Sequence, residues 1–241
     1  MESNLTQLNF EKINPLTYEQ KIGIILGTII MSLILIGLLS LYITLHIKNK
    51  RRDTEGFAFE DRIANLFQDF AKKNEFKFIG AKRFMFGDGN QFEIDGILYC
   101  RHFIMIVEVK YLKGMIEGFA TDDKITISNK NKKRRFNNPI TQNFRHIRHF
   151  QKMTRTKIPC FSLLVLPEFS SYEIKNNPEW NIVANDVNFV QVIEDVYNDF
   201  KVSVPLKNDE IEDMLQAVRE YEVKSLKALK KWEKGLKDVS R

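Results

Sequence analysis

Three acidic residues and one lysine near the middle of the chain have types and spacings that could support chemistry. They are Glu93, Asp95, Glu108 and Lys110, and they belong to two apolar stretches between residues 91 and 111. Carboxylates gathered at one place can hold a divalent cation, and a nearby lysine can act on a bound water molecule. The chemistry therefore depends on whether the fold brings the two stretches together.

The two stretches are predicted to be strands of a β-hairpin with a two-residue turn at 101–102. In that register Asp95 lies opposite Glu108, and Glu93 lies opposite Lys110. Strand side chains alternate between two faces, so these four residues are expected on one face, together with Ile97. Both faces are apolar near the turn, which is typical of strands covered on both sides.

Two carboxylates directly opposite each other, with Cβ atoms about 5 Å apart, repel unless a proton or a cation lies between them. A divalent metal between Asp95 and Glu108 would remove the conflict. The alternative is a polar end of the sheet without catalytic function. In that case Glu93 pairs with Lys110, and one carboxyl of the Asp95 and Glu108 pair is protonated.

Five motifs lie in and around this hairpin: Gly56-x-x-x-Glu60, Glu93-Ile94-Asp95-Gly96, Val107-Glu108-Val109-Lys110, Gly114-x-Ile116-x-Gly118 and Asn138-Pro139-Ile140-x-Gln142. Together they resemble the motifs of the nuclease-related domain (NERD), a family of the PD-(D/E)xK nuclease superfamily. Ile94 stands where the superfamily signature has proline, and Phe59 stands where a second glycine often precedes the helix glutamate. The resemblance covers roughly residues 54 to 200.

The resemblance implies an α/β, restriction-endonuclease-like fold with a mixed central sheet flanked by helices. It also implies a metal-dependent nuclease, with Mg²⁺ or Mn²⁺ held by Asp95, Glu108 and the backbone carbonyl of Val109. Lys110 would orient water or offset negative charge, Glu60 would assist a second metal, and Gln142 would position substrate or solvent. The alternative with the same fold is a catalytically inactive nucleic-acid-binding or scaffold protein.

Charge and hydropathy place the chain at a membrane. The stretch 22–47 contains no Asp, Glu, Lys or Arg and is long enough to span a bilayer. A basic run follows it at 48–52, so the positive-inside rule predicts an extracytoplasmic segment at 1–21 and a cytoplasmic location for the rest. A cleavable signal peptide has a shorter apolar run after a basic segment, which is not the pattern here.

Other patterns divide the remainder of the chain. After a basic linker at 48–53, a nuclease-like domain is expected at 54–206, with its first helix at 54–74 capped by Thr54. Further strands are expected at 76–80, 114–119, 124–128, 160–166, 181–184 and 189–192, and helices at 139–153 and 193–200. A long charged helix at 207–241 would pack on the domain or pair with a second copy between 208 and 238.

A basic run is the second candidate for binding. It contains Lys130, Lys132, Lys133, Arg134 and Arg135, and it is expected in a loop. Such a run is either solvated surface or a contact for the phosphates of nucleic acid, with DNA as the expected substrate. The net charge of +6 agrees with a polyanionic partner or an anionic membrane surface. His146 and His149 are interpreted as surface or packing residues, and Cys100 and Cys160 as thiols in strands.

Overall fold

The computed structural model describes residues 17–130 and 132–224, with the backbone alone at 46–53. Contacts divide the chain into two units, one ending at Asp53 and one beginning at Thr54. In the first unit the helical stretch Tyr18–Leu45 has 28 residues and is long and apolar enough to cross a membrane. The predicted apolar helix is therefore confirmed in its length and composition.

Helix α1 (Tyr18–Lys73) also supplies the first helix of the second unit. Its residues 54–73 bury one apolar stripe, with Phe59, Ile63 and Phe67 each 3% exposed or less. The expected cap at Thr54 is wrong, because α1 passes through this position without beginning there. The backbone at the predicted linker 48–53 is helical as well.

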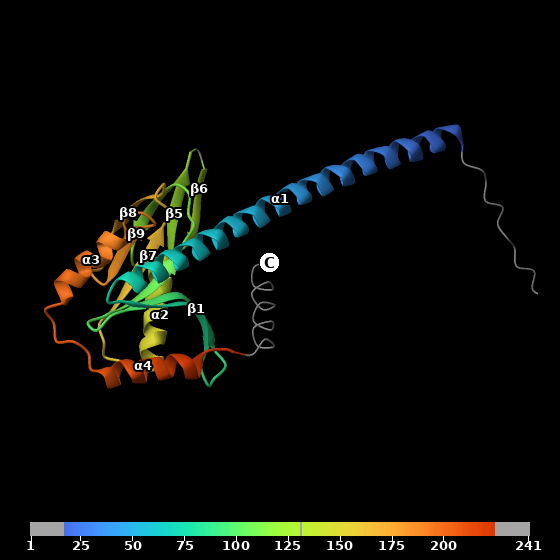
Figure 1. Ribbon diagram of the computed structural model, residues 1–241. Coiled ribbons are helices and arrows are strands. Elements are labelled where there is room, and N and C mark those ends of the chain that lie inside the picture. Colours follow the sequence, from blue (N-terminus) through green and yellow to red (C-terminus); the bar gives the residue numbers. More distant parts are fainter. Residues whose placement is uncertain (1–16, 131, 225–241) are drawn as a thin grey trace, which may run out of the picture. The chain divides into compact units, whose positions relative to one another are not determined.

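The second unit is built on a five-stranded mixed sheet (Figure 1). Its strands, in spatial order, are β1 (Lys77–Met85), β2 (Gln91–Tyr99), β3 (Ile104–Val109), β7 (Cys160–Leu166) and β9 (Asn181–Asn185). The first three pair antiparallel, whereas β3, β7 and β9 are parallel. This confirms the mixed central sheet, and the very apolar sequence of β7 fits its position inside that sheet.

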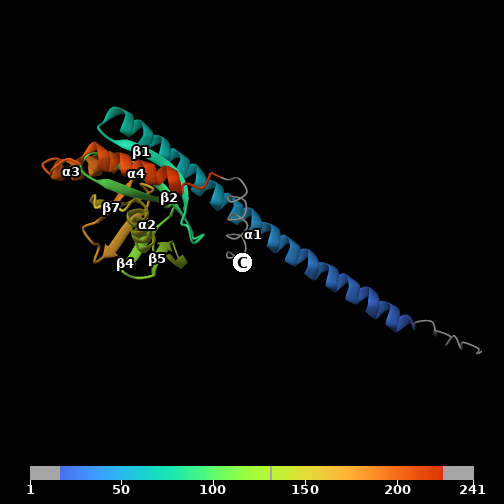
Figure 2. The same cartoon turned by 90° about the horizontal axis from the view of Figure 1, so that it is seen from below.

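Helices cover both faces of the sheet (Figures 1 and 2). They are α1, α2 (Pro139–Thr154), α3 (Phe189–Phe200) and α4 (Asn208–Tyr221). Residues 54–73 of α1 and helix α3 share one hydrophobic core with the sheet, while α2 and α4 share another core on the opposite face. The predicted helix at 139–153 is confirmed, but the strand expected at 189–192 is wrong, since these residues open α3.

The C-terminal helix packs on the domain. Met214 and Val218 of α4 are buried in the same core as α2, and the helix ends at Tyr221, where Glu222 adopts an extended conformation. The part of the predicted helix beyond residue 224, including residues 225–238 of the expected pairing surface, lies outside the described residues.

A second sheet of four strands was not expected. Its order is β6 (Lys132–Asn137), β5 (Lys124–Asn129), β4 (Met115–Phe119) and β8 (Ser171–Lys175). Gly114 introduces this sheet with φ +127°, and a Cβ there would lie 2.2 Å from the Ser128 carbonyl oxygen. The first glycine of the Gly-x-Ile-x-Gly motif is therefore required by a close backbone contact.

The predicted loop at 130–135 is wrong, because most of it forms strand β6. This strand is an edge of the second sheet and pairs with β5 from Lys124↔Asn137 to Asn129↔Lys132. Lys132, Lys133, Arg134 and Arg135 are all exposed. Pairing with β5 holds these cations in an extended row, which a flexible loop would not do.

Asn138 explains the Asn-Pro motif as a structural joint. Its side-chain oxygen accepts a hydrogen bond from the Ile140 N–H at 3.0 Å and caps α2. Its side-chain nitrogen donates to the carbonyls of Phe119, Ala120 and Asp122 at 2.8 to 3.1 Å. Asn138 is fully buried, so it ties the start of α2 to the end of β4.

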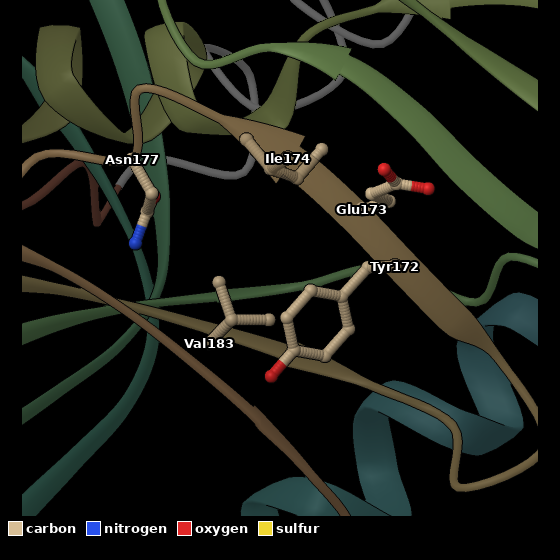
Figure 3. Close-up of a pocket in the computed structure, with 5 residues that line it drawn as sticks. All are labelled: Tyr172, Glu173, Ile174, Asn177 and Val183. Atoms are coloured by element: carbon tan, nitrogen blue, oxygen red, sulfur yellow. The ribbon is translucent and has the colours of Figure 1, made fainter.

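A cavity of about 380 Å³ lies between strand β8 and strand β9, the edge strands of the two sheets. Figure 3 shows Tyr172 and Val183 facing each other across it, while Glu173 points the other way. No convergent set of charged groups lines this cavity, and it has no part in the site described below.

Candidate active site

The candidate site lies where strands β2 and β3 separate. Their pairing runs from Tyr99↔Ile104 to Gly96↔Val107, and beyond it the Cys100 N–H donates to the Phe103 carbonyl at 3.1 Å. The predicted hairpin register is thus confirmed from Cys100 and Phe103 to Gly96 and Val107, whereas the predicted pairs of Asp95 with Glu108 and of Glu93 with Lys110 are not part of the ladder. At the other end the Val109 N–H donates to the Asp95 carboxylate at 2.9 Å. A side chain therefore replaces the strand partner, and the sheet opens at Asp95.

The alternation of faces changes at the Gly80↔Gly96 pair of strands β1 and β2. Leu98 packs in the α1-side core, but Ile94, also an even-numbered residue of β2, packs in the α2-side core. The expectation that Glu93 and Asp95 share one face with Ile97 is therefore wrong. A Cβ at Gly96 would lie 2.7 Å from the Phe78 ring, so glycine lets the ring pack where the face changes.

Glu108 is the most deeply buried of the predicted acidic residues. Its side chain is 1% exposed, and one of its oxygens is 2.5 Å from the Lys110 ammonium. Its other oxygen is 3.5 Å from Nε2 of His146 on α2. Glu93 instead accepts a hydrogen bond from Arg83 at 3.0 Å, so the alternative pairing of Glu93 with Lys110 is wrong.

Glu60 approaches from α1. It lines a cavity of about 90 Å³ with Glu93, Asp95 and Val109. Burial, followed by the charge of Asp95, raises the pKa of Glu60 to about 7. Glu60 and Asp95 interact although they are 35 positions apart in the sequence, because the helix covers the open end of the hairpin.

Burial of negative charge dominates the electrostatics of the site. Burial, and then the charge of Asp95, raises the pKa of Glu108 to about 8, and burial also raises the pKa of Asp95. For Lys110, burial lowers the pKa, but Glu108 and Asp95 outweigh that effect and raise it overall. The site therefore holds a charged lysine among carboxyls whose pKa values burial raises.

His146 is the site residue that the sequence interpretation missed. Its ring is 14% exposed, and burial followed by the charge of Lys110 lowers its pKa to about 4. The His146 ring is therefore neutral at pH 7. Gln142, one helical turn earlier, has its side-chain nitrogen 3.5 Å from His146 Nε2. The spacing of four residues between Gln142 and His146 was the available signal, since such pairs share a helix face.

The structure thus brings five predicted residues together at one end of the central sheet. They are Glu60, Asp95, Glu108, Lys110 and Gln142, from α1, β2, β3, the segment after β3, and α2. The basic residues at 130–135 belong instead to the turn before β6 and to β6 itself, in the other sheet. Two buried side-chain hydrogen bonds, from Asn143 to Ser162 and from Ser162 to Asn181, fix α2 against β7 and β9.

The donors suit a cation that prefers oxygen. Within residues 17–130 and 132–224, no three His, Cys, Asp or Glu side chains form a metal-binding group. The expected set has only two carboxylates, and its third member is the Val109 carbonyl. In a β-strand that pairs antiparallel, the N–H and C=O of one residue point to the same side. The Val109 N–H donates to Asp95, so the Val109 carbonyl also faces the Asp95 side of the strand. Two carboxylates and a peptide carbonyl are all oxygen donors, so the set fits Mg²⁺ or Mn²⁺ better than zinc.

The comparisons agree with the resemblance drawn from the motifs. Residues 55–167 match the family model of the nuclease-related domain. Over 131 residues the chain is 27% identical to a Bacillus anthracis protein described as uncharacterised, which covers 54% of this chain and 59% of that protein. The matched stretch spans less than two thirds of the relative. No solved structure matches the chain.

We predict that the stability of the metal-free protein falls as pH rises from about 5 to 8. The folded Glu108 has a pKa of about 8 against an ordinary 4.5, so over this range the folded state binds more protons than the unfolded state. Each step up in pH therefore reduces the free energy of unfolding. Urea unfolding of the full chain in detergent with chelator, at a series of pH values, measures this slope.

Glu108→Gln should flatten that slope, because the amide imitates the protonated carboxyl without titrating. Glu173→Gln, at an exposed position on β8, is the matched control and should keep the slope of the parent. An equal slope in Glu108→Gln and parent would contradict the burial of an ionisable group at this position.

Proposed function

We propose that the chain is a membrane-anchored, divalent-metal-dependent nuclease acting on nucleic acid, with DNA as the expected substrate. The match of residues 55–167 to the family model of the nuclease-related domain supports this proposal. The observation that carries this proposal is the meeting of Asp95, Glu108, Lys110 and Glu60 at the open end of the hairpin. A purely structural sheet end has no need to bury several carboxyls around one lysine, since each buried charge costs free energy.

The side chains have separate tasks in this proposal. Asp95, Glu108 and the Val109 carbonyl hold Mg²⁺ or Mn²⁺, and Glu60 assists a second ion directly or through water. A bound ion of this kind lowers the pKa of water and stabilises negative charge on a phosphate. Lys110 is 30% exposed and paired with Glu108, so it can reach both a water molecule and the charge that develops on phosphate oxygens.

The α2 side of the site supplies orientation. Neutral His146 lies between Glu108 and Gln142, and it can accept or donate a hydrogen bond without adding charge. His146 lies 3.5 Å from one oxygen of Glu108 and can orient it, and Gln142 positions substrate or solvent beside it. The alternative function, a catalytically inactive nucleic-acid-binding or scaffold protein, is favoured by the exposed cations of β6, which need no catalysis to bind phosphates.

Metal binding and cleavage provide the test of the catalytic proposal. Mg²⁺ or Mn²⁺ should raise the melting temperature of the full chain in detergent, by the equivalent of about 2.7 kcal/mol at a hundredfold excess over Kd. The protein should also cut labelled DNA or RNA in the presence of the ion and stop when chelator is added. Asp95→Asn and Glu108→Gln should lose both responses, because each removes a ligand charge while keeping the side-chain shape.

Lys110→Met should keep much of the metal response and lose cleavage, since lysine is not a ligand. Glu173→Gln serves again as the control and should behave as the parent. Equal thermal shifts in the parent and the carboxylate variants would place the ion elsewhere. Binding of nucleic acid without any cleavage would favour the inactive alternative.

The proposed location is the cell membrane, with the apolar helix spanning it and the second unit in the cytoplasm. The length and composition of Tyr18–Leu45 and the basic run at 48–52 support this orientation. A reporter fused after Arg241 should be active in the cytoplasm, and one fused at the N-terminus should be active outside. Degradation of the second unit by protease added to intact cells would overturn the orientation.

Strand β6 is proposed to contact phosphates without reading sequence. Replacing Lys132, Lys133, Arg134 and Arg135 by glutamine should weaken binding to unrelated sequences equally and flatten the dependence of log Kd on log salt concentration, because fewer counterions are released. Fluorescence anisotropy at several salt concentrations measures the slope. A slope equal to that of the parent would leave these cations as ordinary solvated surface.

A further inference from the structure

Two aromatic side chains lie at the rim of the candidate site, and catalysis as described above does not use them. Phe169 is 60% exposed, and its ring stands edge-on to Tyr111 with 5.8 Å between ring centroids. Tyr111 in turn packs against the buried Phe59 at 5.5 Å. Tyr111 and Phe169 are here called the aromatic rim.

The chain path places the aromatic rim beside the carboxylates. Tyr111 directly follows Lys110, and Phe59 directly precedes Glu60. Strands β3 and β7 are parallel, so the segments that follow them leave the sheet at the same edge. Lys110 and Tyr111 follow β3, and Phe169 follows β7.

The exposed position of Phe169 is held by its neighbours. The Ser170 N–H donates to the Pro167 carbonyl at 2.9 Å, and the Ser170 hydroxyl donates to the carbonyl of Leu112. The Glu168 N–H donates to Asp186 at 2.7 Å, and Asp186 pairs with Arg62 of α1 at 2.6 Å. These bonds tie the turn after β7 to both α1 and the segment after β3, so the Phe169 ring is presented to solvent by a braced turn.

A cation accompanies the aromatic rim. The Lys113 ammonium lies 5.0 Å from the centre of the Tyr111 ring and 2.8 Å from Glu55. Its side chain is 48% exposed. An exposed Phe169 ring beside a lysine that lies over the neighbouring Tyr111 ring matches a nucleotide in which the base stacks on the exposed ring and the phosphate meets the ammonium.

We propose that the aromatic rim stacks unpaired bases, and that the preferred substrate of the site is therefore single-stranded nucleic acid. This inference rests on the proposed nuclease function. In a duplex the base faces are covered by their neighbours, whereas a single strand offers every face to an aromatic ring. Glu108 is 1% exposed, and the cavity beside Glu60 and Asp95 measures about 90 Å³. A flexible strand can lead one phosphate to such a recessed site while its bases rest outside on the aromatic rim.

Binding to matched strands tests the inference separately from cleavage. The full chain carrying Glu108→Gln, in detergent, is titrated into a fluorescein-labelled 20-nucleotide strand and into the duplex of the same sequence, and anisotropy gives Kd for each. Phe169→Ala and Tyr111→Leu should each weaken single-strand binding about tenfold, the size expected for one lost stacking contact. Both should change duplex binding less than twofold.

Phe119→Ala is the matched control. Phe119 is also an exposed aromatic with a lysine over its ring, since it is 44% exposed and Lys175 lies 5.9 Å from the ring centre, but it ends β4 at the far end from Lys113. The control should bind both probes as the parent does. Equal losses on strand and duplex, or no loss in either rim variant, would overturn the inference. Cleavage is then measured in the protein that keeps Glu108. If that protein cuts the single strand and Phe169→Ala cuts it equally well, the inference is overturned while the nuclease function stands.

An exposed phenylalanine near a lysine in an anchored protein can also touch lipid, and a labelling experiment separates the two partners. A Phe169→Cys variant in phosphatidylcholine and phosphatidylserine nanodiscs is treated with a water-soluble maleimide. The native thiols compete poorly, because burial raises the pKa of Cys100 and raises that of Cys160 to about 12. Protection by a single-stranded oligonucleotide supports the inference. Protection by the nanodisc without oligonucleotide, compared with detergent, overturns it.

Discussion

Negative charge buried at the open end of a hydrophobic hairpin is the constraint on which the rest of the site depends. Ionising both Asp95 and Glu108 in this buried position costs free energy, and the positive charge of Lys110 offsets only part of it. Two neighbouring elements supply partners to these groups. The peptide of Val109 donates to Asp95, and α2 presents neutral His146 to Glu108. The domain keeps a group of carboxyls that a cation would stabilise, at a place where the lysine is 30% exposed.

The position of this group follows from how the helices are fixed. Helix α2 begins at Asn138, whose side chain bonds three carbonyls at the end of β4, and it is held further along by the bond from Asn143 to the Ile106 carbonyl at 2.8 Å. Gln142 and His146 lie within one turn of these anchors. The asparagine of the Asn-Pro motif therefore serves the site by orienting a helix, without touching the carboxylates. Residues that identify a family in sequence can thus have structural and chemical tasks side by side.

Sequence patterns predicted the hairpin register, the strand at 160–166, the helix at 139–153 and the group formed by Glu60, Asp95, Glu108, Lys110 and Gln142. The register, the strand and the helix could be predicted because a two-residue turn fixes the pairing and because apolar periodicity indicates burial. Glu60 and Gln142 were assigned to the group only through the resemblance to the nuclease-related domain. The change of faces at the Gly80↔Gly96 pair could not be predicted from the sequence, because the prediction assumes that side chains alternate regularly along the whole strand. Strand β6 was taken for a loop because a run of cations has no apolar face, and its extended form comes from pairing with β5. His146 was passed over because burial of a histidine depends on packing across α2 and β3.

Strand β6 has a further consequence for how copies of the chain meet. An edge strand exposes unpaired backbone groups and is a ready template for pairing with the edge of a neighbouring molecule. Anchoring in a bilayer, as proposed here, confines molecules to a plane and raises the frequency of such encounters. Two β6 strands approaching edge to edge would bring Lys132 to Arg135 of one copy against the same cations of the other, with like charges facing each other. The basic edge is therefore a barrier to sheet-to-sheet aggregation between copies of the chain.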